Sequence, residues 1–364
     1  MLYFAITSNS FRKSSIDELN KISRFKILDE FINSIVIESE ERDFVGKLIQ
    51  NNPIFIYNMV SLQDGVAKIT EENYLETLYQ KLHLVLPNEG SLKIECVDLN
   101  CKTSYSAKEI EIFMGERLEA EGRVIDLKSP DYLAYVIMVN GHCYSGISEF
   151  GRLWKKFIEP ERYYHTNTKY PISRSELKLI QAFDEFKIGQ GMIAIDLGAA
   201  PGGWSNCLLR HKYKVIAIDN GLLEYEKFKN NGIKVRISDS LTINYPDIKA
   251  NDLIHIKSNA RDVSYLGEAI KADLILNDMN MEPEASVSIL LNFSKNLNPG
   301  AGLILTIKCI NRKAELHIRK TEEALSGKFK IISIRCLPAN RQELTLYASY
   351  LGNEKTAENQ NNIT

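Results

Sequence analysis

The stretch from Met192 to Asn206, in which a short apolar run breaks into a glycine-rich turn, constrains the fold of this chain most strongly. Residues 192–195 are apolar throughout, which is typical of a strand buried on both faces. The run ends at Asp196, and a helix is expected from Trp204. The glycines between them are Gly198, Gly202 and Gly203. Glycine lets the backbone approach a ligand closely, and a helix start offers free N–H groups. The stretch therefore predicts an α/β fold with a nucleotide-type ligand site.

A second acidic residue follows the next apolar run. Val215 to Ile218 predicts a neighbouring strand, and Asp219 comes directly after it. In folds of this kind, an acidic side chain at this position accepts hydrogen bonds from ribose hydroxyls. The glycine spacing differs from the dinucleotide fingerprint, which has glycines at its first, third and sixth positions. A tight turn without a ligand is the alternative, but the combination of strand, glycines and acid favours a ligand.

The unbroken string from Asp196 to Ser205 reads Asp-Leu-Gly-Ala-Ala-Pro-Gly-Gly-Trp-Ser and resembles the first motif of the FtsJ-like RNA ribose 2′-O-methyltransferases. This resemblance implies S-adenosylmethionine as the cofactor. The residues that it implies for cofactor binding are Asp196, Gly198, Ala199, Ala200, Pro201, Gly202, Gly203, Trp204, Asp219, Asn259 and Asp278. The family usually has aspartate where Asn259 stands. Either Asn259, whose amide oxygen can accept a hydrogen bond, or Asp262 would contact the adenine.

Four ionisable residues stand at strand ends, or just before the first strand, where an α/β sheet gathers its ligands. They are Lys178, Asp278, Lys308 and Glu343. Lys308 ends a run of apolar residues, and a lysine there is costly to bury without a partner. In chain order the four match the Lys-Asp-Lys-Glu tetrad of the FtsJ-like family. The resemblance implies that all four are catalytic.

The expected chemistry is methylation of a ribose 2′-hydroxyl, which must lose its proton as it attacks. A free lysine has a pKa of ~10.4, and crowding by a second lysine with partial desolvation is expected to lower it. We expect Lys308 to be the general base or hydroxyl activator, with Lys178 and Glu343 orienting it and the ribose. Asp278 is expected to hold Lys308 and to face the sulfonium. The sequence after residues 273–277 lacks the Asn/Asp-Pro-Pro-Tyr pattern of amino-group methyltransferases and the cysteine of cytosine-5 enzymes.

Residues 173–351 alternate strand and helix patterns and predict a doubly wound, Rossmann-like α/β domain. The expected strands are 192–196, 214–219, 233–237, 253–257, 273–277, 302–308, 331–336 and 343–350. The expected helices include 203–211, 222–230, 262–270, 284–297 and 313–327. The last two strands should pair as a hairpin.

The N-terminal half predicts two α+β domains. Residues 1–68 read β-α-β-β-α-β, the order of a ferredoxin-like unit. Residues 69–150, with an amphipathic helix from Ser106 to Ala120 followed by Val124 to Asp131, resemble the THUMP domain, an RNA-binding module. The resemblance implies binding of the acceptor end of tRNA or of another RNA with a free end. A purely structural α+β domain is the alternative.

Residues 151–172 form an expected linker in which cations and aromatic residues are interleaved. Cations contact phosphates and aromatic rings stack on unpaired bases, although aromatic packing between domains with solvated charges explains the pattern equally well. The side chains expected to bind RNA are Lys102, Lys108, Arg152, Lys155, Lys156 and Arg174.

Composition and charge limit which partners and which cellular compartment we expect for this protein. The formal net charge is −2, so any RNA-binding surface must be local. The six cysteines form no Cys-x-x-Cys pair and stand at no zinc spacing, which predicts no metal and a reducing compartment. The N-terminus has no signal-peptide pattern and no apolar run could span a bilayer, so we expect a soluble cytoplasmic protein without a membrane partner. The polar residues 352–364 are expected to be disordered.

These patterns predict an S-adenosylmethionine-dependent RNA ribose 2′-O-methyltransferase that acts on structured RNA. The THUMP resemblance favours tRNA near its acceptor stem. The arrangement also resembles the RlmM branch of the family, which favours a cytidine of 23S rRNA. A non-catalytic RNA-binding or assembly factor is an alternative of another class, and the complete tetrad argues against it.

Overall fold

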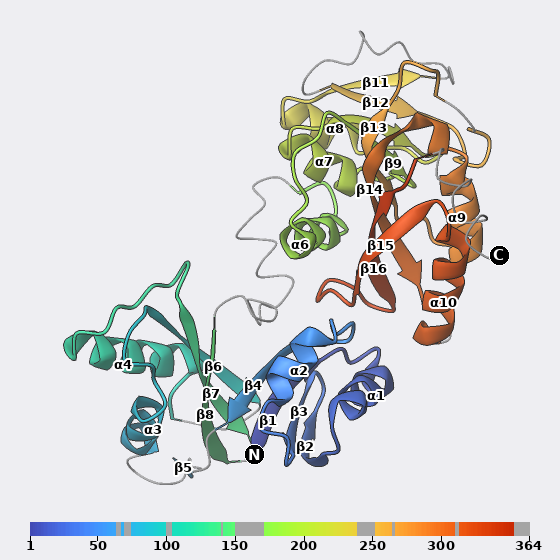
Figure 1. Cartoon of the computed structure of the whole chain (residues 1–364). Coiled ribbons are helices and arrows are strands. Elements are labelled where there is room, and N and C mark those ends of the chain that lie inside the picture. The colour runs from blue at the N-terminus through green and yellow to red at the C-terminus, as the bar shows by residue number, and fades with distance from the viewer. Residues whose placement is uncertain are drawn as a thin grey trace, which may run out of the picture. The chain divides into compact units, whose positions relative to one another are not determined.

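The computed structural model describes residues 1–62, 67–68, 74–99, 104–139, 141–149, 171–238, 252–263, 266–309 and 313–352. The chain divides into two compact units, Met1–Phe157 and Ile158–Thr364, and each contains one eight-stranded sheet (Figure 1). The predicted linker 151–172 lies almost wholly outside the described residues, and so does the predicted tail after residue 352. Both stay predictions, as does the division of the N-terminal half after residue 68.

The first part of the N-terminal unit follows the order β-α-β-β-α-β. Its elements are Leu2–Thr7 (β1), Arg12–Ile22 (α1), Lys26–Phe31 (β2), Ser34–Glu38 (β3), Phe44–Gln50 (α2) and Ile56–Leu62 (β4). The strands lie in the order β2-β3-β1-β4 and are all antiparallel. Alternate residues of β1 and β3 pack against both helices around the fully buried Tyr3, Phe44 and Leu48.

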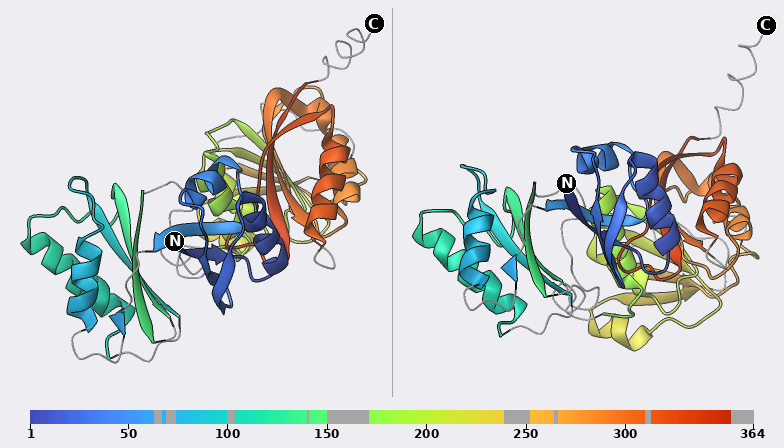
Figure 2. Two further views of the ribbon diagram at one scale, coloured as in Figure 1. Left: turned by 60° about the horizontal axis from the view of Figure 1, so that its bottom comes forward. Right: turned by 90° about the horizontal axis from the view of Figure 1, so that it is seen from below.

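The rest of the N-terminal sheet belongs to a second group of elements. They are Ala67–Lys68 (β5), Tyr74–His83 (α3), Leu92–Leu99 (β6), Ala107–Ala120 (α4), Tyr132–Val139 (β7) and His142–Glu149 (β8). Strand β8 pairs with β4 and so joins the two groups into one sheet. Helices α3 and α4 cover one face of β6, β7 and β8 around the buried Leu78 and Met114 (Figure 2). Helix α4 begins with a capping box formed by Ser106 and Glu109.

The C-terminal unit is a mixed sheet with helices on both faces. Its elements are Glu176–Phe186 (α6), Ile193–Leu197 (β9), Gly203–Arg210 (α7), Lys214–Ile218 (β10), Tyr225–Asn230 (α8), Lys234–Ser238 (β11), Asp252–Ile256 (β12), Ala272–Asn277 (β13), Pro283–Leu291 (α9), Leu297–Lys308 (β14), Ala314–Leu325 (α10), Phe329–Arg335 (β15) and Glu343–Tyr350 (β16). The strand order is β11-β12-β10-β9-β13-β14-β16-β15, and β16 is the strand of this sheet that runs opposite to the others. Helices α6, α7 and α8 lie on one face, and α9 and α10 lie on the other (Figure 1). The predicted α/β fold and the hairpin of the last two strands are confirmed.

The strand order fixes where a ligand can bind. From β9 the chain proceeds to β10 on one side, while β13 pairs with β9 on the other side. In open α/β sheets, ligands bind beyond the carboxyl ends of the strands at such a switch point. The loops after β9, β10 and β13 therefore surround the expected site.

The predicted helix over residues 262–270 is wrong for the described residues of that range, which form turns. The buried Asn296 explains why. Its side-chain oxygen accepts a hydrogen bond from the Leu266 amide at 3.0 Å, and its amide group donates to the carbonyls of Gly267 and Ile270 at 2.9 and 3.0 Å. A single asparagine thus satisfies three backbone groups of this segment in a conformation that is not helical.

Candidate active site

The glycine-rich loop after β9 holds Gly198, Ala199, Ala200, Pro201 and Gly202, and α7 begins with Gly203 and Trp204. Gly198 and Gly202 have φ of +74° and +112°, a region that L side chains rarely adopt. A Cβ atom on Gly198 would lie 2.7 Å from Cγ of Met279, and one on Gly202 would lie 2.5 Å from the Phe228 ring. Contacts of the chain with itself therefore require both glycines, whether or not a ligand also approaches them.

Replacing Gly202 with alanine should destabilise the C-terminal unit by about 3 kcal/mol, because backbone strain and overpacking against Phe228 combine. Gly232→Ala is the matched control. Gly232 also has a positive φ, +72°, but a Cβ there would meet nothing within 4 Å, so only the strain of about 1 kcal/mol applies. Urea unfolding followed by circular dichroism measures both losses. Equal losses would contradict the packing argument.

Asp219 lies half-buried directly after β10 and braces the glycine-rich loop. Its Oδ2 accepts a hydrogen bond from the Ala200 amide at 3.0 Å, and its Oδ1 accepts one from the Gly221 amide at 2.7 Å. The buried His255 donates from Nε2 to the Asp219 carbonyl at 3.0 Å, and its Nδ1 accepts from the Tyr225 hydroxyl at 2.7 Å. Burial lowers the pKa of His255, which favours this neutral form. Each carboxylate oxygen can accept a second hydrogen bond, so Asp219 is able to hold two ribose hydroxyls.

Asp196 is buried at the end of β9, where it is 1% exposed. Its Oδ2 accepts a hydrogen bond from the Ser205 hydroxyl at 2.7 Å. Burial raises the pKa of Asp196 to about 7; the Ser205 hydrogen bond opposes this rise, and the charges of Asp278 and Asp219 add to it. The carboxyl group therefore helps to fasten α7 to β9, and its predicted contact with a cofactor stays a prediction.

Two further residues expected at the cofactor use their polar atoms within the protein. Trp204 is buried and donates its indole N–H to the Ser175 carbonyl at 2.9 Å. Asn259 is exposed after β12, and its side-chain oxygen accepts from the Arg261 amide at 3.0 Å. Asp262 is exposed in the same turn. The choice between Asn259 and Asp262 as the adenine contact therefore stays open.

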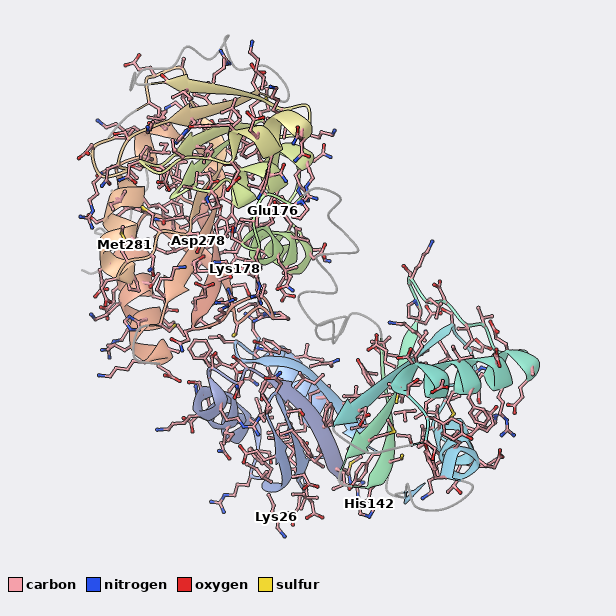
Figure 3. All side chains as sticks on the ribbon, turned by 180° about the vertical axis from the view of Figure 1, so that it is seen from behind. Lys26, His142, Glu176, Lys178, Asp278 and Met281 are labelled. Atoms are coloured by element: carbon pink, nitrogen blue, oxygen red, sulfur yellow. The ribbon has the colours of Figure 1, made fainter. Side chains whose placement is uncertain are left out.

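The four ionisable residues that the sequence singled out come together in one cluster, and Figure 3 shows Lys178 beside Asp278. Nζ of Lys178 donates to Oδ2 and Oδ1 of Asp278 at 2.7 and 3.0 Å and pairs with Oε1 of Glu343 at 2.9 Å. Nζ of Lys308 donates to Asp278 Oδ1 and to Glu343 Oε2, both at 2.7 Å. The four side chains are only 12–16% exposed. Each lysine thus contacts both carboxylates, and the four form a closed ring of alternating charge.

The sheet explains how residues far apart in the sequence form this ring. Asp278 follows β13, and Lys308 ends the adjacent strand β14. Lys308 and Glu343 face one another as partners in the pairing of β14 with β16. Lys178 reaches the two carboxylates from α6. The ring therefore lies at the same edge of the sheet as the glycine-rich loop.

The expected lowering of the Lys308 pKa is wrong. Burial does lower this pKa, but the charges and hydrogen bonds of Asp278 and Glu343 outweigh burial, and the pKa is raised. For Asp278, burial acts to raise the pKa, but Lys178 and Lys308 outweigh it and the pKa is lowered. The expectation failed because the two lysines are separated by carboxylates. Lys308 therefore carries its proton at neutral pH.

Sequence reasoning missed two buried polar residues at this site. Glu176, at the start of α6, is fully buried, and Asn277, at the end of β13, is too. The Asn277 amide donates to the Ser286 carbonyl at 3.1 Å, and its side-chain oxygen accepts from the Met279 amide at 3.1 Å. It thereby fixes the loop that carries Asp278. The signal was a polar residue ending an apolar run, because such a residue needs partners once it is buried.

Two of the six side chains expected to bind RNA are described. Lys108 in α4 is 66% exposed and forms an ion pair with Glu111 at 3.3 Å. Arg174 is exposed just before α6. The others, Lys102, Arg152, Lys155 and Lys156, lie outside the described residues.

Across the part of the chain that the structure describes, no group of three or more His, Cys, Asp or Glu side chains is placed to hold a metal ion. Among the same residues, no helix has both the length and the apolar character needed to cross a membrane.

Comparison with known proteins connects the site to a family. Residues 171–320 match the model of the FtsJ-like methyltransferase family. An uncharacterised protein of Methanocaldococcus jannaschii is 34% identical over 187 residues, which cover 48% of this chain and 46% of that protein. The ribosomal RNA large subunit methyltransferase M of Aliivibrio salmonicida is 29% identical over 231 residues, which cover 56% of this chain and 61% of that enzyme. The chain therefore spans less than two thirds of either relative.

Among solved structures, TrmN from Thermus thermophilus has a TM-score of 0.39 at 15% identity, over 96% of this chain and 100% of that chain. This likeness is too low to inform function. The family match supports the predicted FtsJ-like methyltransferase domain over residues 171–320, a range that includes the glycine-rich loop, Lys178, Asp278 and Lys308. Glu343 lies beyond the matched range and is linked to the others by geometry. The THUMP-like and ferredoxin-like domains stay predictions.

Proposed function

We propose that this chain is an S-adenosylmethionine-dependent methyltransferase that acts on the 2′-hydroxyl of an RNA ribose. The observation that carries the proposal is the ring of Lys178, Asp278, Lys308 and Glu343 beside the glycine-rich loop. A glycine-rich loop with an acid at the next strand end suits a donor that contains a nucleoside. A lysine fixed between two carboxylates suits activation of a hydroxyl group.

The residues around the loop fit the donor that FtsJ-like methyltransferases use. When bound, S-adenosylmethionine supplies an electrophilic methyl group on a positively charged sulfur. Asp219 would hold the hydroxyls of its ribose, and Asp278 would face the positive charge. Asp196, Asp219 and Asp278 lie close enough for the charges of the latter two to raise the pKa of Asp196. Such acidic surroundings favour a cation over a neutral ligand.

Within this proposal, the small fraction of Lys308 that is neutral removes the proton from the 2′-hydroxyl. Its Nζ is fixed by Asp278 and Glu343 at 2.7 Å each, so it is held in one direction. The proton passes from the hydroxyl to Nζ, which leaves the oxygen nucleophilic. Lys178 and Glu343 orient Lys308 and the ribose. The alignment of the reactants by this rigid ring supplies the rest of the acceleration.

The raised pKa of Lys308 predicts a pH dependence. Only a small neutral fraction of Lys308 can accept a proton at pH 7, and this fraction grows as the pH rises toward the pKa. The single-turnover rate of methyl transfer should therefore increase about tenfold per pH unit from about pH 6.5 to 9. Rapid-quench measurements at saturating donor, with donor affinity determined at each pH, give this slope. A rate that does not change with pH would contradict the role of Lys308 as a base. It would indicate that Lys308 acts through its positive charge.

The proposed substrate is structured RNA. One observation favours tRNA and another favours rRNA. The THUMP-like pattern of residues 69–150 favours tRNA near its acceptor stem. The name of the Aliivibrio salmonicida relative favours large-subunit rRNA. In either case we propose that the N-terminal unit, the linker 151–172 and basic side chains such as Lys108 and Arg174 hold the RNA. This proposal includes a cytidine as the target nucleoside.

The test is transfer of a labelled methyl group from S-adenosylmethionine to separate pools of unmodified tRNA and rRNA, followed by nucleoside analysis. Label in tRNA supports the THUMP-guided reading, and label only in rRNA supports the relationship to methyltransferase M. Transfer to neither pool, while the donor still binds, would contradict catalysis on free RNA. It would favour a non-catalytic RNA-binding factor.

A further inference from the structure

Glu176 is a buried carboxylate at the start of α6 and is fully shielded from solvent. Its Oε1 accepts hydrogen bonds from the amides of Ile172 and Ser173 at 2.5 and 3.4 Å. Its Oε2 accepts from Asn206 Nδ2 and from Arg210 Nη2, both at 3.2 Å. Burial raises the pKa of Glu176 despite these four donors. A carboxylate is costly to bury, and these four donors offset part of that cost.

Glu176 lies between the two helices that carry the parts of the site. Asn206 and Arg210 belong to α7, the helix that begins at the glycine-rich loop. Glu176 itself begins α6, which presents Lys178 to Asp278 and Glu343. Figure 3 shows Glu176, Lys178 and Asp278 in the same region of the C-terminal unit. Glu176 therefore connects the helix of the proposed donor loop to the helix that carries one lysine of the ring.

Two other contacts hold the start of α6 against the start of α7. Trp204 donates its indole N–H to the Ser175 carbonyl at 2.9 Å. A Cβ atom on Gly203 would lie 2.2 Å from Oγ of Ser173 and 2.6 Å from Oγ of Ser175. The two serines just before α6 therefore leave no room for a side chain at residue 203. The first turn of α6 thus rests directly on the start of α7. Among these contacts, Glu176 is the one that places a charge between the helices.

We infer that Glu176 is a positioning residue, which holds Lys178 in the ring by fastening the first turn of α6 to α7. This inference rests on the proposed methyltransferase function. Glu176 is separated from Lys178 by a single residue, and the helix backbone transmits its position. A displacement of about 1 Å at a reacting group can lower a rate roughly 100-fold. Loss of the fastening should therefore slow the chemical step and leave the binding of the methyl donor nearly unchanged.

The test compares Glu176→Gln with Glu185→Gln in the full-length protein. Glutamine keeps the size of the side chain, but its NH₂ group cannot accept from Asn206 or Arg210. Glu185 is the matched control because it lies on the same helix and forms an ion pair with Arg335 at 2.9 Å, away from α7. We expect Glu176→Gln to lower the single-turnover rate of methyl transfer about 10-fold to 100-fold. The dissociation constant of S-adenosylhomocysteine, measured by calorimetry, should stay within about threefold of the wild-type value, and Glu185→Gln should change neither quantity by more than about twofold.

A double variant separates positioning from a general loss of structure. If Glu176 acts through Lys178, then adding Glu176→Gln to Lys178→Ala should cost little further rate, because coupled residues are not additive. Multiplied losses would overturn the inference, and so would a parallel weakening of S-adenosylhomocysteine binding. If Glu176→Gln does not fold, Glu176→Asp shortens the same carboxylate and takes its place.

Hydrogen exchange keeps this test independent of the proposed function. Amides in the first turn of α6 should exchange faster in Glu176→Gln than in Glu185→Gln, and equal exchange would overturn the inference. If the wild-type protein transfers no methyl group to any RNA, the proposed function fails. The exchange comparison then still decides whether Glu176 fastens the helix.

Discussion

Lys308→Ala should lower the rate of methyl transfer by about 10³-fold while the affinity for S-adenosylmethionine changes less than about threefold. General base catalysis contributes 10²-fold to 10⁴-fold in typical enzymes, and Lys308 contacts both carboxylates of the ring at 2.7 Å. Its removal also leaves Asp278 with one lysine instead of two. The donor is expected to bind mainly through the loops after β9 and β10, so its affinity should survive.

Single-turnover kinetics and calorimetry measure these two effects. Lys330→Ala is the matched control, because Lys330 is exposed on β15. The substitution removes the same charge at a position outside the ring. Lys308→Arg should fail to restore the rate, because a guanidinium group stays charged and cannot act as a base. Full activity of Lys308→Ala would show that the assigned base is wrong. A rate of Lys308→Arg close to that of the wild type would show that the charge of residue 308, and not proton transfer, is what the reaction needs.

Asp196→Asn should change the pH dependence of stability. The pKa of Asp196 is raised by burial to about 7 in the folded protein, above the value of about 3.9 in an unfolded chain. The folded state therefore binds the proton more tightly, and the free energy of unfolding falls as the pH rises from about 4 to 7. The cost at full ionisation is about 4 kcal/mol. Asparagine is neutral at every pH and avoids this cost.

Relative to the wild type, Asp196→Asn should gain about 3 kcal/mol of unfolding free energy between pH 5 and pH 8. Taking the difference between the two proteins cancels the contributions of Asp219, Asp278 and other groups to a first approximation. Urea unfolding in a Trp154→Phe background leaves Trp204, which is buried in α7, as the fluorescent reporter of the C-terminal unit. A difference that does not change with pH would show that Asp196 is ionised in the folded protein without cost.

The fold and the site of the C-terminal unit were predictable from local pattern. Runs such as Ile193–Leu197 and Ala272–Asn277 are short and mostly apolar, which favours central strands of a covered sheet. Because such strands end at a common edge, the positions of Asp278 and Lys308 in the sequence were enough to bring them together. Glu343 was predicted from the family resemblance, and it is the pairing of β14 with β16 that places it opposite Lys308.

Other features depend on contacts that local pattern does not contain. The raised pKa of Lys308 follows from the alternation of charges around the ring, whereas the sequence shows only that two lysines are available. Glu176 looks like an ordinary acidic residue in a first helical turn, yet its partners come from α7. Residues 262–270 have helical periodicity, but the distant Asn296 satisfies their backbone in another conformation.

The most direct test of the central claim is where the methyl group is attached. RNA that has been incubated with the protein and labelled S-adenosylmethionine is digested to nucleosides and analysed by mass spectrometry, with Lys308→Ala as the parallel sample. We predict label on the ribose, as a 2′-O-methylnucleoside, from the wild-type protein and none above background from the variant. Label on a base, or equal ribose label from both proteins, would contradict the proposed role of the ring.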